Sequence, residues 1–121
     1  LAMNAQIQKD YDTAIEYYRT ALQHDPNRVD IHLNIGKVYF KQGKFDKAVE
    51  TYKKAIQIDG KDPDIFFNLG LAYEKLGEVE RSIKSIKMAV KLCPDFADGY
   101  YNIGRIYKDM NKTPEAVAKS C

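Results

Sequence analysis

Apolar residues recur along most of this chain at positions i, i+3, i+4 and i+7, the spacing that gathers side chains on one side of an α-helix. Glycine and proline interrupt these stretches, because glycine adopts left-handed backbone at little cost and proline cannot continue the helical hydrogen-bond ladder. The pattern predicts helices near residues 11–24, 30–42, 45–58, 63–76 and 79–92, and a further helix that begins near residue 97. We therefore expect an all-α chain.

The apolar pattern repeats with a period of 34 residues. In three of the predicted helices a ring, an aliphatic residue, a glycine and a tyrosine lie at i, i+3, i+4 and i+7. These groups are His32-Ile35-Gly36-Tyr39, Phe66-Leu69-Gly70-Tyr73 and Tyr100-Ile103-Gly104-Tyr107. Glycine inside a helix costs about 1 kcal/mol relative to alanine, which is tolerable where a paired helix packs closely against it. Small residues of the following helices, such as Ala48 and Ala55, supply the facing side, so we expect a stack of closely packed helix pairs.

This pattern resembles the tetratricopeptide repeat family, whose units are helix-turn-helix pairs of 34 residues. The resemblance implies a right-handed α-α superhelix, a solenoid of about three and a half repeats that forms one domain. The predicted units are residues 29–62 and 63–96, with a partial repeat at 1–28 and a truncated repeat at 97–121. Residues 1–28 are expected to hold the end of a first helix and a complete second helix. Because both ends cut through the repeat pattern, we expect a fragment of a longer protein.

The balance of charge argues against partners that bind by long-range electrostatics. Charged residues make up 30% of the chain, yet the formal net charge is only +2, so nucleic acid and anionic membranes are not expected partners. No apolar run approaches the length of a membrane span. The two cysteines, Cys93 and Cys121, show no C-x-x-C spacing, which favours a reducing compartment such as the cytoplasm.

The chain offers few residues for chemistry. His24 and His32 are the only histidines, and neither has a cysteine or serine at a recurring spacing, so we expect no metal, no cofactor and no enzymatic activity. Lys84, Lys87 and Lys91 form a basic stripe on one second helix. Such a stripe is either a solvated outer surface or a contact for an acidic partner.

Candidate binding residues lie on the side of each first helix that packing leaves free. The resemblance implies that this side lines the concave surface of the superhelix. Three rows follow the period: asparagines Asn34, Asn68 and Asn102; apolar residues Leu33, Phe67 and Tyr101; and the mixed row Lys37, Leu71 and Arg105, with Lys108 beyond it. Amide side chains both donate and accept hydrogen bonds, so the asparagines are predicted to hold the backbone of an extended peptide. Within the apolar row Phe67 and Tyr101 are predicted anchors, and the three basic residues are predicted to attract acidic groups.

The asparagine row has other interpretations. Asparagine at this position is common in the family and also supports the turn between helices. The chain resembles the carboxylate clamp of co-chaperones only at Asn34 and Asn68, because Asp64 and Asp98 stand where a clamp has lysine and Asn102 where it has arginine. The row is more similar to the inner ladder of the repeat domain of O-linked N-acetylglucosamine transferases, which contacts protein substrates.

The sequence therefore predicts a non-enzymatic protein–protein interaction scaffold that binds a peptide segment of a partner in its groove. Two alternatives stay open. The chain could be the substrate-recruiting arm of a larger enzyme, such as an O-linked N-acetylglucosamine transferase. It could also self-associate through its incomplete end repeats, with apolar helix faces near residues 1–7 and Val117 buried between copies.

Overall fold

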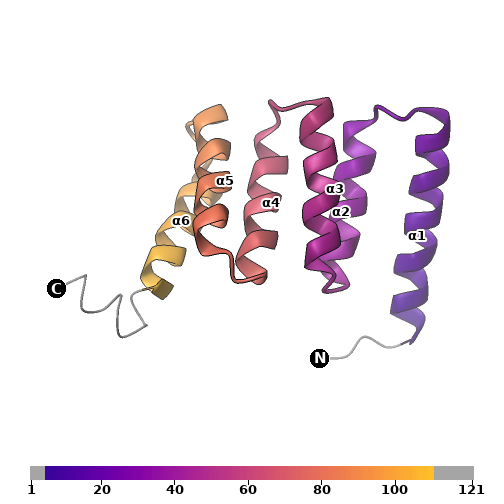
Figure 1. The fold of residues 1–121 in the computed structure, drawn as a ribbon, viewed down its shortest axis with the longest axis horizontal. Helices are drawn as coiled ribbons and strands as arrows, with labels where there is room; N and C mark the ends of the chain where they lie inside the picture. Colours follow the sequence, from indigo (N-terminus) through magenta and orange to yellow (C-terminus); the bar gives the residue numbers. More distant parts are fainter. Residues whose placement is uncertain (1–4, 111–121) are drawn as a thin grey trace.

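A computed structural model describes residues 5–110 of the chain, and this part contains helices and no strand. The helices are α1 Ala5–His24, α2 Val29–Lys41, α3 Phe45–Ile58, α4 Pro63–Lys75, α5 Val79–Leu92 and α6 Ala97–Met110 (Figure 1). The all-α repeat architecture predicted from the sequence is confirmed. The second helix expected after residue 113 lies outside the described residues.

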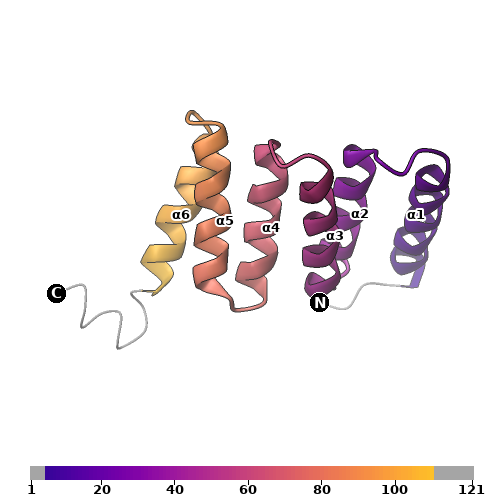
Figure 2. The same ribbon diagram turned by 45° about the horizontal axis from the view of Figure 1, so that its top comes forward.

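The helices stand side by side in chain order, and each runs back along the one before it (Figure 1). In Figures 1 and 2, α3 and α5 lie nearer the viewer than α2 and α6, so first and second helices occupy different sides of the array. We call the outward side of α2, α4 and α6 the first-helix face. The outward side of α1, α3 and α5 is the second-helix face.

Short glycine turns join the two helices of a pair. Gly43 and Gly77 have φ values of 79° and 80°, in the left-handed region where residues with a Cβ are disfavoured. After the first of these turns the amide of Lys44 donates to the carbonyl of Tyr39 at 2.9 Å, which satisfies an acceptor at the end of α2. The turn thereby returns the chain directly onto the helix that it has just left.

The start of the chain differs from the prediction. We expected residues 1–28 to contain the end of one helix, a turn and a second helix, but α1 runs without interruption from Ala5 to His24. Lys9 stands 34 residues before Gly43, so the glycine that makes the other turns is missing here. The side chain of Gln6 donates to Asp10 Oδ1 at 3.1 Å across one helical turn, as in a continuous helix.

Paired helices approach each other most closely at the interior glycines. A Cβ placed on Gly36 would overlap the ring of Tyr52. A Cβ on Gly70 would lie 2.5 Å from Ile86 Cγ1 and 3.0 Å from the carbonyl oxygen of Ser82. The predicted close approach is confirmed at Gly36 and Gly70, but large side chains of the partner helix, Tyr52 and Ile86, fill the space in place of the small residues expected there. A Cβ on Gly104 would meet no described atom within 4 Å.

The apolar core follows the same pairs. One cluster of buried residues joins α1 to α4, with Tyr52, Ala55 and Ile65 fully enclosed. A smaller cluster of Ile83, Ile86 and Ile106 lies between α5 and α6. Each cluster is built by neighbouring helices, so each repeat is stabilised by its contacts with the adjacent repeats.

Tyr52 buries a hydroxyl that has no hydrogen-bond partner among the described residues. An unpaired buried polar group loses its hydration without compensation, which lowers stability. Burial also raises the pKa of Tyr52 well above its ordinary value of 10.0, because a phenolate would be even more costly to desolvate. The ring fills the space over Gly36, but the hydroxyl does not contribute to the packing.

We expect Gly70→Ala to lower the free energy of unfolding by about 1 to 3 kcal/mol, because the new methyl group meets Ile86 and backbone of α5. The control is Gly60→Ala, where the nearest atom to a new Cβ is the carbonyl oxygen of Ile56 at 3.5 Å, an ordinary contact. Urea denaturation followed by circular dichroism measures both. Equal stability of the two variants would contradict the close-approach explanation.

We expect Tyr52→Phe to leave the free energy of unfolding within about 0.5 kcal/mol of the wild type or to raise it, because the ring stays and only an unpaired hydroxyl goes. Tyr52→Ala serves as the contrasting variant and should cost about 3 to 5 kcal/mol. A large loss of stability in Tyr52→Phe would show that the hydroxyl has a partner.

The raised pKa of Tyr52 also predicts a dependence on alkaline pH. The folded state keeps this phenol protonated at a pH where the unfolded chain ionises it, so its contribution is complete below pH 10.0 and declines as the pH rises further. The free energy of unfolding should therefore fall less steeply above this pH in Tyr52→Phe than in the wild type. Parallel pH profiles for the two proteins would contradict this assignment.

Candidate peptide-binding face

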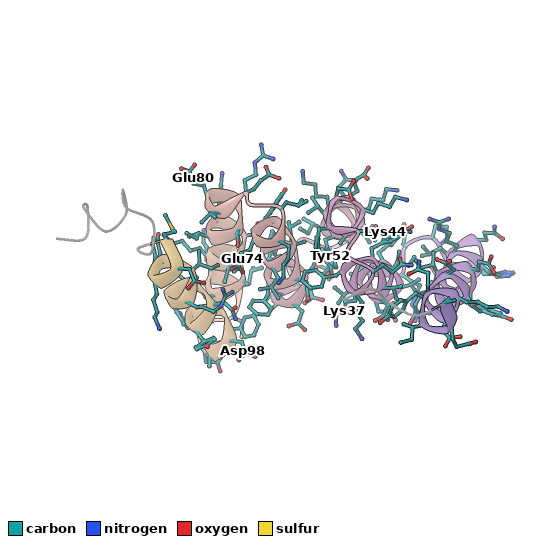
Figure 3. The ribbon with its side chains drawn as sticks, turned by 90° about the horizontal axis from the view of Figure 1, so that it is seen from below. Lys37, Lys44, Tyr52, Glu74, Glu80 and Asp98 are labelled. Atoms are coloured by element: carbon teal, nitrogen blue, oxygen red, sulfur yellow. The ribbon has the colours of Figure 1, made fainter. Side chains whose placement is uncertain are left out.

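The first-helix face collects the residues that the repeat pattern leaves outside the core. Figure 3 shows Lys37 of α2 and Asp98 of α6 on one side of the array and Glu80 of α5 on the other. The predicted residues come from three helices that follow one another on this side, α2, α4 and α6. The face therefore runs across the three first helices that the structure describes.

The three asparagines are half-buried, and two of them bond to their own helices. Asn68 Nδ2 donates to the carbonyl of Asp64 at 2.7 Å, and Asn102 Nδ2 donates to the carbonyl of Asp98 at 2.8 Å. Each amide has two hydrogens and an acceptor oxygen, so one such bond leaves further capacity for a ligand. The bonds also fix the direction of the side chains, which the sequence did not reveal.

The apolar row has one exposed and two partly buried members. Phe67 packs edge-on against Phe96, with ring centroids 5.0 Å apart, and also contacts the core cluster between α5 and α6. Leu33 packs partly against the larger core cluster. Tyr101 is 69% exposed. Tyr101 is therefore the anchor that is most available to a ligand, whereas Phe67 also supports the fold.

The predicted basic residues are not equivalent. Lys37 and Lys108 are exposed, but Arg105 binds Glu74 through two hydrogen bonds of 2.7 Å each. Arg105 Nη1 also lies 3.4 Å from Asp109 Oδ2. The bond and the charge of Glu74 raise the pKa of Arg105, so the guanidinium stays positive while its charge is balanced within the chain.

Glu74 is a residue of this face to which the sequence analysis assigned no role. It lies on α4 and reaches across to α6, where Arg105 also donates to Asn102 Oδ1 at 2.9 Å. The pair is separated by 31 residues in the sequence, and it forms because neighbouring first helices stand side by side. The only available signal was the position of both residues on the free side of their helices.

Two further kinds of site, a metal centre and a membrane span, are absent from the described part of the chain. Residues 5–110 contain no group of three or more histidine, cysteine, aspartate or glutamate side chains arranged to hold a metal ion. Within the same residues, no helix combines the length and the apolar character needed to cross a bilayer. Cys121 lies outside the described residues, and Cys93 is partly buried with its thiol 3.1 Å from Asp95 Oδ1.

Family models match almost the whole chain. Models of the tetratricopeptide repeat match residues 5–54, 63–96 and 97–118, and a model described as a TPR repeat matches residues 36–77. The protein in the crystal structure of MamA shares 30% sequence identity with this chain. The match covers 98% of this chain and 71% of the MamA chain. This chain belongs to the tetratricopeptide repeat family.

Solved structures agree with this assignment. The TM-score to MamA is 0.78, and a second structure of MamA protein gives 31% identity and a TM-score of 0.76. The match to that second structure covers 93% of our tetratricopeptide repeat chain. It covers only 62% of the length of the MamA chain. The first TPR of Spaghetti (RPAP3), bound to the HSP90 peptide SRMEEVD, has the same fold at 22% identity, with a TM-score of 0.78 and coverage of 84% of our chain and 81% of its own. A comparison with curated proteins finds no match.

The contact between Glu74 and Arg105 predicts measurable coupling between neighbouring repeats. In a double-mutant cycle of Glu74→Gln and Arg105→Gln, we expect a coupling energy of about 1 kcal/mol, because the pair is bidentate and partly shielded from water. Urea denaturation of the four proteins gives this value. Strictly additive losses would contradict the existence of the pair in solution.

Proposed function

We propose that this chain is a protein-interaction scaffold that binds an extended peptide segment of a partner across its first-helix face and performs no chemistry of its own. The observation that carries the proposal is the exposure of Tyr101 next to the half-buried Asn102 in α6, with the half-buried Asn68 on the preceding first helix, α4. Tyrosine is enriched among the residues that dominate binding energies, and each asparagine amide keeps hydrogen-bonding capacity beyond the bond to its own helix. The shared fold with a peptide-bound TPR supports the same conclusion.

The geometry favours an extended peptide. Packed helices lie about 8 to 10 Å apart, which matches about three residues of extended chain at about 3.3 Å each. The amides of Asn34, Asn68 and Asn102 recur once per repeat, so they are placed to bond to peptide backbone at that interval. Leu33, Phe67, Leu71 and Tyr101 then provide apolar contacts for side chains on the peptide.

The charges favour an internal segment over a free C-terminus. Asp64 and Asp98 are exposed in the first turns of α4 and α6, where they would repel a terminal carboxylate. Arg105 is already balanced by Glu74. Lys37 and Lys108 attract acidic side chains of the ligand. Arg105 contributes less as long as it is paired with Glu74.

The test is selection of peptides from a random display library, followed by affinity measurement with the protein variants. We expect selected peptides to lose at least about tenfold in affinity when Asn34, Asn68 and Asn102 are all changed to alanine, since several backbone hydrogen bonds are removed. Tyr101→Ala should cost a similar factor. The peptide SRMEEVD should bind far more weakly than the selected peptides.

The matched control removes three exposed polar side chains from α1 and α3, helices that supply none of the predicted binding residues, with Thr20, Gln23 and Gln57 changed to alanine. Thr20 bonds to a carbonyl of its own helix, as Asn68 does, so local effects on the helix are comparable. Circular dichroism checks that all variants keep their helicity. Retention of full affinity by the folded asparagine variant would contradict the proposal and leave the row as a structural feature of the family.

A further inference from the structure

Two notches open on the second-helix face, one in each successive repeat. The first lies between α1, α2 and α3 with a volume of about 380 Å³, and the second between α3, α4 and α5 with a volume of about 340 Å³. Their lining residues are related by the period of 34: Arg19 and Lys53, Tyr39 and Tyr73, Lys47 and Arg81. The notches are therefore a repeated feature of the array, and the first-helix face has no part in them.

A buried tyrosine lies at the base of each notch, with cations from two second helices around it. Tyr39 and Tyr73 are 7% and 6% exposed. Lys53 Nζ of α3 and Arg81 Cζ of α5 lie 5.8 and 6.0 Å from the ring centroid of Tyr73, so cations from both sides converge on one ring. In the first notch Lys47 Nζ lies 5.8 Å from the ring centroid of Tyr39.

The first notch also presents a hydroxyl to a ligand. Arg19 Nη2 donates to the hydroxyl oxygen of Tyr39 at 2.6 Å. Because that oxygen accepts from Arg19, the tyrosine keeps its own proton for donation to an acceptor in the notch. A carboxylate is the side-chain acceptor that suits a hydroxyl donor surrounded by cations.

The positive charge of the notches is largely unbalanced within the described part of the chain. The charged residues that line the second notch are Lys53, Arg81 and Lys84, with no acidic residue among them. Its single ion pair joins Arg81 to Glu78 at 3.1 Å, and these side chains are 64% and 41% exposed. Such exposed pairs are weak and compete poorly with a ligand. The first notch has three cations against the one carboxylate of Glu50.

We propose that the second-helix face binds an acidic polypeptide segment whose aspartate or glutamate side chains enter these notches. The segment would cross α3, and the exposed Lys87 of α5 continues the row of Arg19 and Lys53 at the same period. This assigns the basic stripe on α5 to binding an acidic partner. The site is separate from the first-helix face, so each proposal can fail without the other.

The notches suit carboxylate side chains better than other anionic partners. Single-stranded nucleic acid binds by stacking bases on exposed aromatic rings, but the rings of Tyr39 and Tyr73 are buried. Insertion of apolar side chains among the headgroups strengthens binding to an anionic bilayer, and at the base of these notches Ile35 and Leu69 are each only 5% exposed. A flexible acidic chain can place one side chain in each notch.

The test uses the whole chain and a fluorescein-labelled peptide of alternating glutamate and alanine, with alternating glutamine and alanine as the uncharged probe. The test variant carries Lys53→Gln, Arg81→Gln and Lys84→Gln. The control variant carries Lys41→Gln, Lys61→Gln and Lys75→Gln, which remove the same charge from exposed lysines outside the notches. Fluorescence anisotropy gives the affinities, and amide chemical shifts in wild-type protein locate the site.

We expect the test variant to bind the glutamate peptide at least about tenfold more weakly than the control variant, and added salt to weaken wild-type binding. Shifts should concentrate on α3 and α5 around Tyr73. The proposal is overturned if both variants weaken equally, if the shifts lie on the first-helix face, or if the glutamine peptide binds as well. Tighter binding of a single-stranded oligonucleotide or of phosphatidylserine vesicles through the same three residues would overturn the assignment to an acidic polypeptide.

Discussion

The close approach of paired helices at their interior glycines is the constraint on which the rest of this structure depends. At Gly36 and Gly70 the absent side chain is replaced by Tyr52 and Ile86 from the partner helix. This packing brings each second helix onto its first helix, and the apolar contacts between pairs then extend the stack. The packing leaves the outward side of each first helix free to vary, and the first-helix face lies there. The notches of the second-helix face are instead built over packed residues, Tyr39 and Tyr73.

The sequence predicted the features that depend on local pattern. The helices, the glycine turns and the reason for the interior glycines follow from spacing within one repeat, because each repeat contacts mainly its neighbours. The prediction for residues 1–28 was wrong at one point, where Lys9 replaces the turn glycine and α1 continues. A periodic pattern shows where a turn should lie, but the residue at the turn decides whether the helix ends there.

The features that the sequence did not show depend on distances between repeats. Arg105 was predicted to be free for an acidic ligand, and its bond to Glu74 depends on how far α4 and α6 stand apart. The notches were missed for the same reason, since Lys53 and Arg81 meet over Tyr73 only after three helices have packed together. The bonds of Asn68 and Asn102 to their own helices did not follow from the sequence pattern, because they depend on the conformation of each side chain.

The two faces have different chemistry, which fits a scaffold that makes two kinds of contact. The first-helix face combines amides with an exposed aromatic ring and largely balanced charge, whereas the second-helix face concentrates cations around buried tyrosines. The central claim is that an extended peptide lies across the first-helix face. The most direct measurement is a set of intermolecular nuclear Overhauser effects between a library-selected peptide and the isotope-labelled chain. We predict contacts from the peptide to the Tyr101 ring and to the side-chain amides of Asn68 and Asn102, in one continuous direction across α4 and α6. Contacts confined to α3 and α5 would contradict the claim.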